Sequence, residues 1–250
     1  MSKKVVAAKK SVKSKFNLSR VDTANKSEPV KRAILIHNQT VSSISNFHSL
    51  YVQSHDIDPA SPGYADQDLL RAMLLFSCSG LDAVVKQLVQ DTLESVLKYD
   101  EGAQREFRKY VERRLKKAGN SDDRDRLVAP SFTDTALLAE LLVSFDPRST
   151  LISNLTRSLL SDSLQSRDQL LKVASHFAVT KDEIMLDERV TQNAFVARNQ
   201  MTHEMDIDLE GGRLRRERQY EDITKWCLNI IEISNRFIES INSKITQKTI

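Results

Sequence analysis

The sequence predicts an all-α protein, and three observations carry this prediction. Apolar residues recur at the spacing of an amphipathic helix over long stretches of the 250-residue chain. No run alternates between apolar and polar residues in the way that a half-buried strand requires. The prolines, which a helix interior excludes, all fall outside the periodic stretches, at Pro29, Pro59, Pro62, Pro130 and Pro147.

The first half of the chain is expected to hold two long helices and a charged third one. The first begins near Pro29, a residue that suits the first helical position, and runs to about Ser54. The second runs from Asp66 to about Leu97, and its apolar stripe is wide enough for a central helix buried on most sides. Residues 101–118 form a strongly charged helix. We interpret it as a solvated face, with a nucleic-acid-binding surface as the alternative.

Shorter helices and one long closing helix are expected in the second half. A polar loop covers residues 119–130, and a turn is expected at Pro147. Helical patterns follow near residues 134–144, 149–160, 166–177, 181–189, 187–206 and 220–245.

Positive charge is concentrated at the N-terminus. Residues 1–32 hold ten Lys or Arg against Asp22 and Glu28, a net charge of +8, and because the whole chain carries +3, the remainder carries −5. We interpret residues 1–28 as a basic, disordered tail that keeps the protein soluble. Sequence-independent attraction to nucleic acid and an organellar transit peptide stay open as alternatives.

Composition excludes several classes of protein. None of the six glycines builds the phosphate-binding loop of a P-loop or Rossmann enzyme. The two cysteines, Cys78 and Cys227, each lie in an apolar helical stretch, which argues against a metal or redox pair. No apolar run approaches the roughly 20 residues that span a bilayer, and no secretory signal is present. A soluble protein of the reducing cytoplasm, without a membrane partner, is therefore expected.

Polar chemistry interrupts a helical pattern at one place, the segment that contains Arg198, Asn199 and His203. Asn199 and His203 are four residues apart and share a helix face, while Arg198 has a side chain long enough to curl round to the same groove. The helix is expected to end at the acidic run after His203 and the Gly211-Gly212 pair. These three residues are the candidate active site. The alternative is an ordinary helix end with a capping His and a solvated Arg.

Supporting residues are expected on two other segments. Asp82 lies at the edge of the apolar face of the second helix and needs a partner, either Arg198 or His203 across the core or a residue of a neighbouring helix. A basic turn follows the glycine pair and could track an RNA backbone or be solvated; its members are Arg213, Arg215, Arg216 and Arg218. Neither a metal nor a cofactor is expected, since the acids beside His203 form no H-E-x-x-H motif.

The segment Arg198-Asn-Gln-Met-Thr-His203-Glu-Met-Asp206 resembles the R-x4-6-H signature of the HEPN superfamily, especially its RiboL-PSP-HEPN-like branch, where it commonly reads R-N-x-apolar-x-H-E-x-D. Ser79-Gly-Leu-Asp-Ala-Val-Val-Lys-Gln-Leu88 is similar to the small-x-L-D-x-apolar pattern of that branch. The resemblance covers residues 66–97 and 187–245, and Met201-Thr202 are less apolar than usual. It implies an HEPN-like helical domain over residues 29–250, with residues 101–165 as a helical insertion.

The resemblance implies that the protein is a metal-independent endoribonuclease. It also implies a homodimer in which the R-x4-H helices of the two chains meet. Such proteins are often toxins with an antitoxin partner or effectors of antiviral defence. RNA cleavage by its own 2′-hydroxyl needs a base, an acid and cations beside the phosphorane. A two-fold dimer places two His203 and two Arg198 in one cleft and so supplies both proton carriers. Asn199 would orient the phosphate or His203. The alternatives are a non-catalytic HEPN-like module that binds nucleic acid or protein, and a purely structural helical protein.

Overall fold

The computed structural model describes residues 16–57, 64–119, 139, 141–212 and 214–247. Within these ranges the chain is all-α, as predicted, and an isolated bridge between Ile207 and Arg215 is the sole β-pairing. The helices are η1 Glu28–Val30, α1 Lys31–Ile57, α2 Tyr64–Tyr99, α3 Glu101–Gly119, α5 Pro147–Ser161, α6 Arg167–His176, α7 Lys181–Ile184, α8 Glu188–His203 and α9 Tyr220–Thr246.

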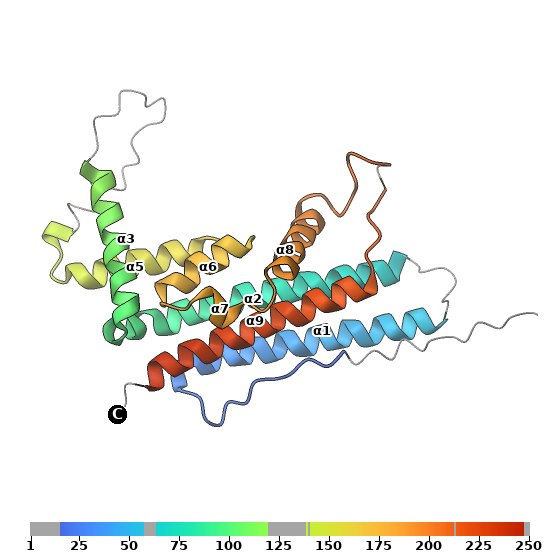
Figure 1. Cartoon of the computed structure of the whole chain (residues 1–250), viewed down its shortest axis with the longest axis horizontal. Coiled ribbons are helices and arrows are strands. Elements are labelled where there is room, and N and C mark those ends of the chain that lie inside the picture. Colours follow the sequence, from blue (N-terminus) through green and yellow to red (C-terminus); the bar gives the residue numbers. More distant parts are fainter. Residues whose placement is uncertain (1–15, 58–63, 120–138, 140, 213, 248–250) are drawn as a thin grey trace, which may run out of the picture.

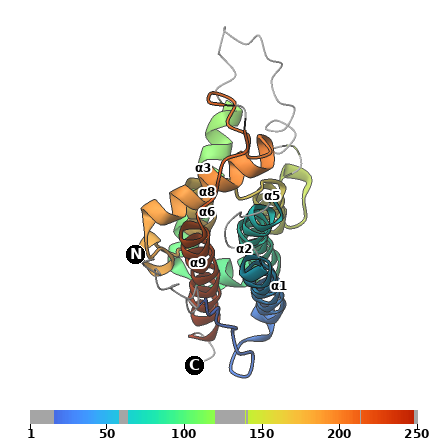
Figure 2. The same cartoon turned by 90° about the vertical axis from the view of Figure 1, so that its right-hand side faces the viewer.

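Three long helices, α1, α2 and α9, lie side by side and form the body of the molecule (Figures 1 and 2). Its core consists of their apolar stripes, including Ile34, Leu81 and Phe237, none of which has exposed surface. Gly80 lets α1 and α2 approach closely, because a Cβ atom at this position would lie 2.2 Å from Cγ2 of Thr40. The glycine of the small-x-L-D-x-apolar segment is therefore a packing residue.

Helix α2 is long and apolar enough to cross a membrane when judged by length and composition alone. This corrects the expectation that no segment approaches such a span. More than half of its most apolar window is buried inside the protein, where α2 packs against α1, α9 and α5. A helix in the core of a bundle passes the same test of length and composition.

The segment predicted as a helical insertion, residues 101–165, provides α3 and α5, which cover the C-terminal half of α2. The apolar face of α5 reaches the core through Ile152, Leu155 and Leu159. Helix α3 packs on α2 and α6 and stands across the long helices in Figure 1. Of the short helix predicted near 134–144, Ala139 and residues 141–143 are helical, and the rest of it lies almost wholly outside the described residues.

Capping side chains determine where several helices begin and end, which periodicity alone does not predict. Asp146 accepts hydrogen bonds from the backbone N–H groups of Arg148 and Ser149, so α5 begins at Pro147 rather than Ser149. The prediction of a single helix over residues 181–189 is wrong, because two helices share this range. Helix α7 ends at Ile184, and the Asp187 carboxylate accepts the Val190 N–H at 3.0 Å and starts α8.

The N-terminal strap, residues 16–27, corrects the prediction that residues 1–28 form a disordered tail. Val21 is buried, and its backbone N–H and C=O each bond to the side-chain amide of Asn38 on α1 at 2.9 Å. Further along, the Ser27 N–H donates to Oδ1 of Asn242 on α9 at 2.9 Å. The strap therefore belongs to the helical body, and the part of the predicted tail from Met1 to Lys15 lies outside the described residues.

Candidate functional site

Helix α8 carries the three predicted site residues and ends at His203, in the last turn, as the sequence predicts. Its inner side packs into the core through Ala194, Phe195 and Met201, which are at most 5% exposed. These buried residues fix how α8 is rotated against the bundle. The rotation decides which side chains of the candidate site face outward.

His203 lies on the outer side of α8. A helix turns by about 100° per residue, so Val196, Asn199 and His203 form one stripe and Arg198 lies about 140° from His203. The His203 side chain is exposed, and in the described part of the chain it makes no hydrogen bond or ion pair. Its imidazole is free to bind a ligand or a second protein molecule.

Arg198 lies at the inner edge of α8 and is half-buried. Its Nη1 donates to Oδ1 of Asn199 at 2.9 Å. Burial and the neighbouring Cys227 raise the pKa of the Cys78 thiol on α2, and the positive charge of Arg198 opposes that shift. The guanidinium group is thus held by the amide of the neighbouring Asn199.

Asn199 and Asp82 hold the same loop, the short connection between α5 and α6. Nδ2 of Asn199 donates to the Gln165 carbonyl at 3.0 Å, and one oxygen of Asp82 accepts the Leu164 N–H at 2.9 Å. The other oxygen of Asp82 pairs with Lys86 at 2.9 Å. The expectation that Asp82 directly holds Arg198 or His203 is wrong. It is connected to Arg198 only through the 164–165 loop and Asn199.

The structure therefore brings Arg198 and Asn199 together and leaves His203 apart from both. Asn199 uses its oxygen for Arg198 and its amide for the loop, so its side chain fixes the guanidinium in place. A single protomer has a positioned cation and an exposed imidazole on different sides of one helix.

Asp206 belongs to the acidic run that the sequence predicts at the end of this helix, and its carboxylate is buried beneath that end of α8. Asp206 has no exposed surface and accepts bonds from Nε of Arg71 at 2.7 Å and Nε of Arg218 at 3.1 Å. Burial acts to raise the pKa of Asp206, but the bonds to Arg218 and Arg71 outweigh it and lower the pKa. Arg218 also donates to Oε1 of Gln200 at 2.8 Å.

The chain makes a sharp turn directly after His203 so that Asp206 can point inward. Met205 and Asp206 have positive φ angles of 51° and 61°, in the left-handed region that non-glycine residues seldom adopt. The backbone N–H of Asp206 donates to the Gln200 carbonyl at 3.0 Å, which closes the turn onto α8. The two arginines thus hold a strained turn next to the exposed imidazole.

The predicted RNA-binding arginines are engaged within the protein. Arg215 pairs with Asp68 at 2.8 Å, and Arg216 pairs with Glu204 at 2.9 Å. Arg218 binds the buried Asp206. Arg213 lies outside the described residues. A role of these side chains in RNA binding stays a prediction, and each described one already shares its charge with a carboxylate.

Among the residues that the structure describes, no group of three or more His, Cys, Asp and Glu side chains is placed to hold a metal ion. The acids next to His203 have arginine partners instead. The expectation that the site uses neither metal nor cofactor stays a prediction.

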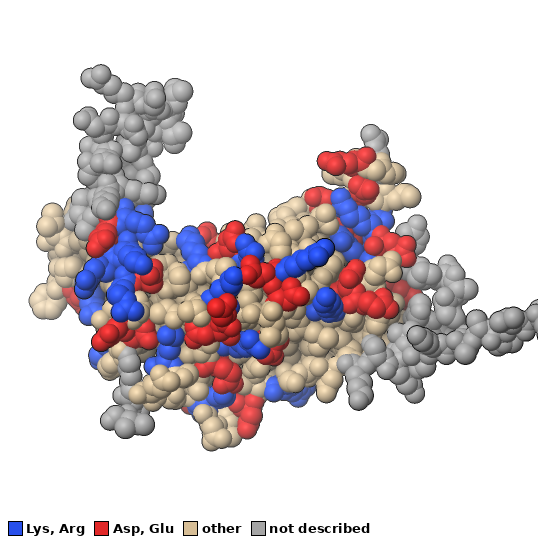
Figure 3. All heavy atoms as spheres, in the orientation of Figure 1, with Lys and Arg blue, Asp and Glu red and all other residues tan. Residues whose placement is uncertain are grey.

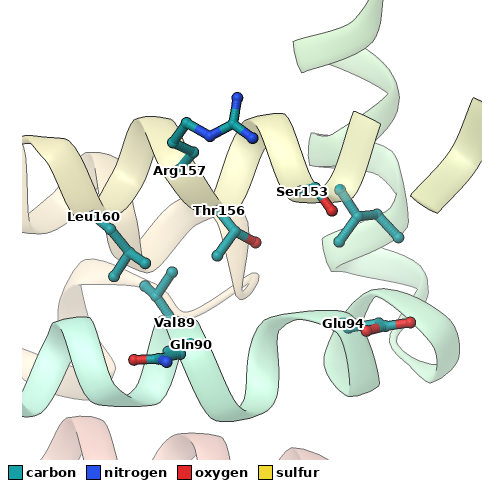
Figure 4. Close-up of a pocket in the computed structure, with 8 residues that line it drawn as sticks. Val89, Gln90, Glu94, Ser153, Thr156, Arg157 and Leu160 are labelled. Atoms are coloured by element: carbon teal, nitrogen blue, oxygen red, sulfur yellow. The ribbon is translucent and has the colours of Figure 1, made fainter. Parts of the chain in front are cut away.

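A shallow groove of about 370 Å³ lies between α2 and α5, away from α8 (Figure 4). Its lining residues are Val89, Gln90, Glu94, Ile152, Ser153, Thr156, Arg157 and Leu160. None of the predicted site residues contributes to this groove, so it is separate from the candidate site.

Comparisons with family models, with curated proteins and with solved structures find no match to this chain.

Proposed function

We propose that the protein is a metal-independent endoribonuclease whose active site is built from Arg198 and His203 of two protomers. The observation that carries this proposal is that the end of one helix carries both an exposed imidazole without a hydrogen-bond partner among the described residues and a guanidinium group held by Asn199. The resemblance of this segment to the HEPN signature points to the same chemistry. The two side chains supply a proton carrier and a phosphate-binding cation.

Cleavage of RNA by its own 2′-hydroxyl requires a proton carrier and a cation that binds phosphate. One His203 takes the proton of the 2′-hydroxyl as the oxygen attacks phosphorus, and the partner protomer's copy of this imidazole protonates the leaving 5′-oxygen. The products carry a 2′,3′-cyclic phosphate and a 5′-hydroxyl. Arg198 stabilises the additional negative charge on the phosphorane. Asn199 acts as a positioning residue for Arg198.

Exposed apolar side chains next to His203 support a second chain at this place. Val196 on the outer stripe of α8 is 45% exposed. In the loop that follows the helix, Met205, Leu209 and Leu214 are 66%, 64% and 74% exposed. Apolar surface that surrounds a polar centre is typical of a protein–protein contact. A two-fold axis beside α8 would cover these residues and bring the two imidazoles together.

The test is RNA cleavage by the purified chain and by His203→Ala, Arg198→Ala and Asn199→Ala. Loss of a general acid–base group lowers the rate by roughly 10²- to 10⁴-fold, and loss of a charge-stabilising donor by roughly 10²- to 10³-fold. EDTA has no effect, and the new ends are 2′,3′-cyclic phosphates. Full activity of His203→Ala contradicts the site assignment. Absence of cleavage over a broad RNA panel contradicts the nuclease proposal.

One observation favours the alternative, a non-catalytic helical module that binds nucleic acid or a protein partner. Arg198 and His203 lie about 140° apart around α8, so a protomer that acts alone has no convergent site. A chain that is monomeric at micromolar concentration and binds RNA without cleaving it would therefore be this module.

A further inference from the structure

Helix α3 is the most basic element that the structure describes. Its 19 residues, EGAQREFRKYVERRLKKAG, include seven Lys or Arg and three Glu, which gives a net charge of +4. The helix stands across the three long helices and projects beyond them (Figures 1 and 2). Lys and Arg side chains gather over α3 at the left-hand end of the surface in Figure 3.

The inner side of α3 is anchored and the outer side is free. Ala103 is fully buried, and Phe107 and Tyr110 pack against the core, which orients the helix. On the outer side, Arg105, Arg108 and Arg113 are exposed. None of the three makes an ion pair within the described residues. Arg113 donates to the backbone carbonyl of Lys109 within α3, and its charge adds to the larger effect of Lys109 in lowering the pKa of Glu106.

The neighbouring helix α6 extends this cationic face. Burial lowers the pKa of His176 most; the charges of Arg113 and Lys172 lower it further and that of Glu106 raises it, so all three charged groups lie near the α3–α6 contact. Lys172, like the α3 arginines, has no acidic partner in the part of the chain that the structure describes. The positive potential is therefore shared by two helices rather than scattered over one.

The arginines after the glycine pair differ from those of α3 in their ion pairs, although both groups are basic clusters in the sequence. Arg215, Arg216 and Arg218 each pair with a carboxylate. Exchanging such a pair for a phosphate contact gains little, because one ion pair is lost for each one formed. Cations without an internal partner lose only water and counterions when they bind a polyanion, and counterion release favours that binding.

We propose that the outer face of α3, with Lys172 of α6, binds the sugar-phosphate backbone of single-stranded RNA. At 1.5 Å per residue, α3 is about 28 Å long, which suits several successive phosphates. The contacts are to phosphate, so they hold RNA regardless of its sequence and leave its bases free. This inference rests on the proposed nuclease function, for which α3 is a substrate-docking arm separate from the chemistry at α8.

The experiment is the salt dependence of RNA binding, measured by fluorescence anisotropy with a labelled, 2′-O-methylated single-stranded 20-mer that cannot be cleaved. The test variant is Arg105→Gln/Arg108→Gln/Arg113→Gln, in which glutamine keeps the helix propensity. With a slope of about 0.7 for each neutralised phosphate contact, the plot of log K against log salt becomes shallower by about 2. At 0.1 M salt this corresponds to roughly 100-fold weaker binding.

A matched control removes three surface charges elsewhere, in Lys31→Gln/Lys181→Gln/Lys225→Gln, and is expected to keep the wild-type slope. The α3 triple Arg→Lys variant keeps the charge and is also expected to bind normally, which separates loss of charge from loss of fold. A DNA strand of the same sequence binds with the same slope, since the contacts are to phosphate.

If the Gln variant keeps the wild-type slope of log K against log salt, the proposal is overturned. It is also overturned if the control variant loses as much slope as the Gln variant. Tighter binding of polyglutamate than of RNA, lost in the Gln variant, would also overturn the RNA proposal, because it would indicate that α3 binds an acidic protein partner. Because the RNA probe cannot be cleaved, these outcomes do not depend on catalysis. Absence of cleavage of ordinary RNA, with the slope difference intact, would contradict the nuclease and leave the docking surface in place.

Discussion

Replacing Asp206 by Asn tests whether the buried carboxylate holds the end of α8. Asp206 is fully buried, and the side chains of Arg71 and Arg218 are only 6% and 12% exposed. A neutral amide in place of the carboxylate would leave the buried guanidinium group of Arg218 without a counter-charge, and Arg71 with only the exposed Asp68, which lies 3.1 Å away. Removing one partner of such a buried pair costs about 3–5 kcal/mol. For a domain of this size, at about 2–4 °C per kcal/mol, the melting temperature falls by roughly 10 °C.

The control for this measurement lies two residues away. Asp208 carries the same carboxylate, but its side chain is 46% exposed and its oxygen lies 3.7 Å from Arg216. Asp208→Asn is expected to cost less than about 1 kcal/mol, as for other surface pairs. Thermal and urea denaturation followed by circular dichroism measure both variants. Equal stability of Asp206→Asn and Asp208→Asn would refute the view that the Arg71–Asp206–Arg218 cluster is a structural support.

Three further predictions concern packing, pH and the N-terminus. Gly80→Ala is expected to lower the free energy of unfolding, measured by urea titration, by about 1–3 kcal/mol, because the added methyl group overpacks against Thr40. Gly212→Ala is the control and is expected to be nearly neutral, because its added Cβ would meet no atom closer than 3.9 Å. Burial, with the charge of Arg113, lowers the pKa of His176 from 6.5 to about 4, so the folded state keeps the ring neutral and loses stability as the pH falls from 6.5 towards 4. His176→Phe is expected to flatten this pH dependence, and an unchanged urea midpoint profile would contradict the argument. Deleting residues 1–15, which include six Lys, is expected to weaken RNA binding without changing stability or the saturated rate of RNA cleavage; deleting the strap as well should lower the melting temperature.

Helical periodicity was sufficient to predict the fold class and the long helices. The apolar stripes of α1, α2 and α9 are long, and the predicted starts at Pro29, Asp66 and Tyr220 lie close to the observed ones at Lys31, Tyr64 and Tyr220. Boundaries set by one side chain, such as the Asp187 cap between α7 and α8, were missed because a helical pattern continues across them. The strap was missed because it is held by side-chain amides of α1 and α9, which leave no periodic signal in residues 16–27.

The candidate site was predictable in its residues and not in its contacts. The sequence indicates that Arg198, Asn199 and His203 share one helix end, and α8 has that form. It does not indicate that Asp206 turns inward, because its partner Arg71 lies 135 residues away along the chain. A D-x-D run beside glycines is typical of a solvated loop. The available signal was that nearby arginines could supply the charge that a buried acid needs.

Activity in mixed dimers tests the central claim, a composite site that needs His203 from two protomers. Wild-type chain is refolded with an equal amount of His203→Ala chain, and RNA cleavage is measured per total chain. If both imidazoles are needed, activity falls to about one quarter, because random pairing leaves about one quarter of the dimers with both copies of His203. A mixture with tagged wild-type chain controls for refolding and keeps full activity. A fall to only one half would contradict the composite site, because it would mean that each protomer cleaves RNA with its own His203.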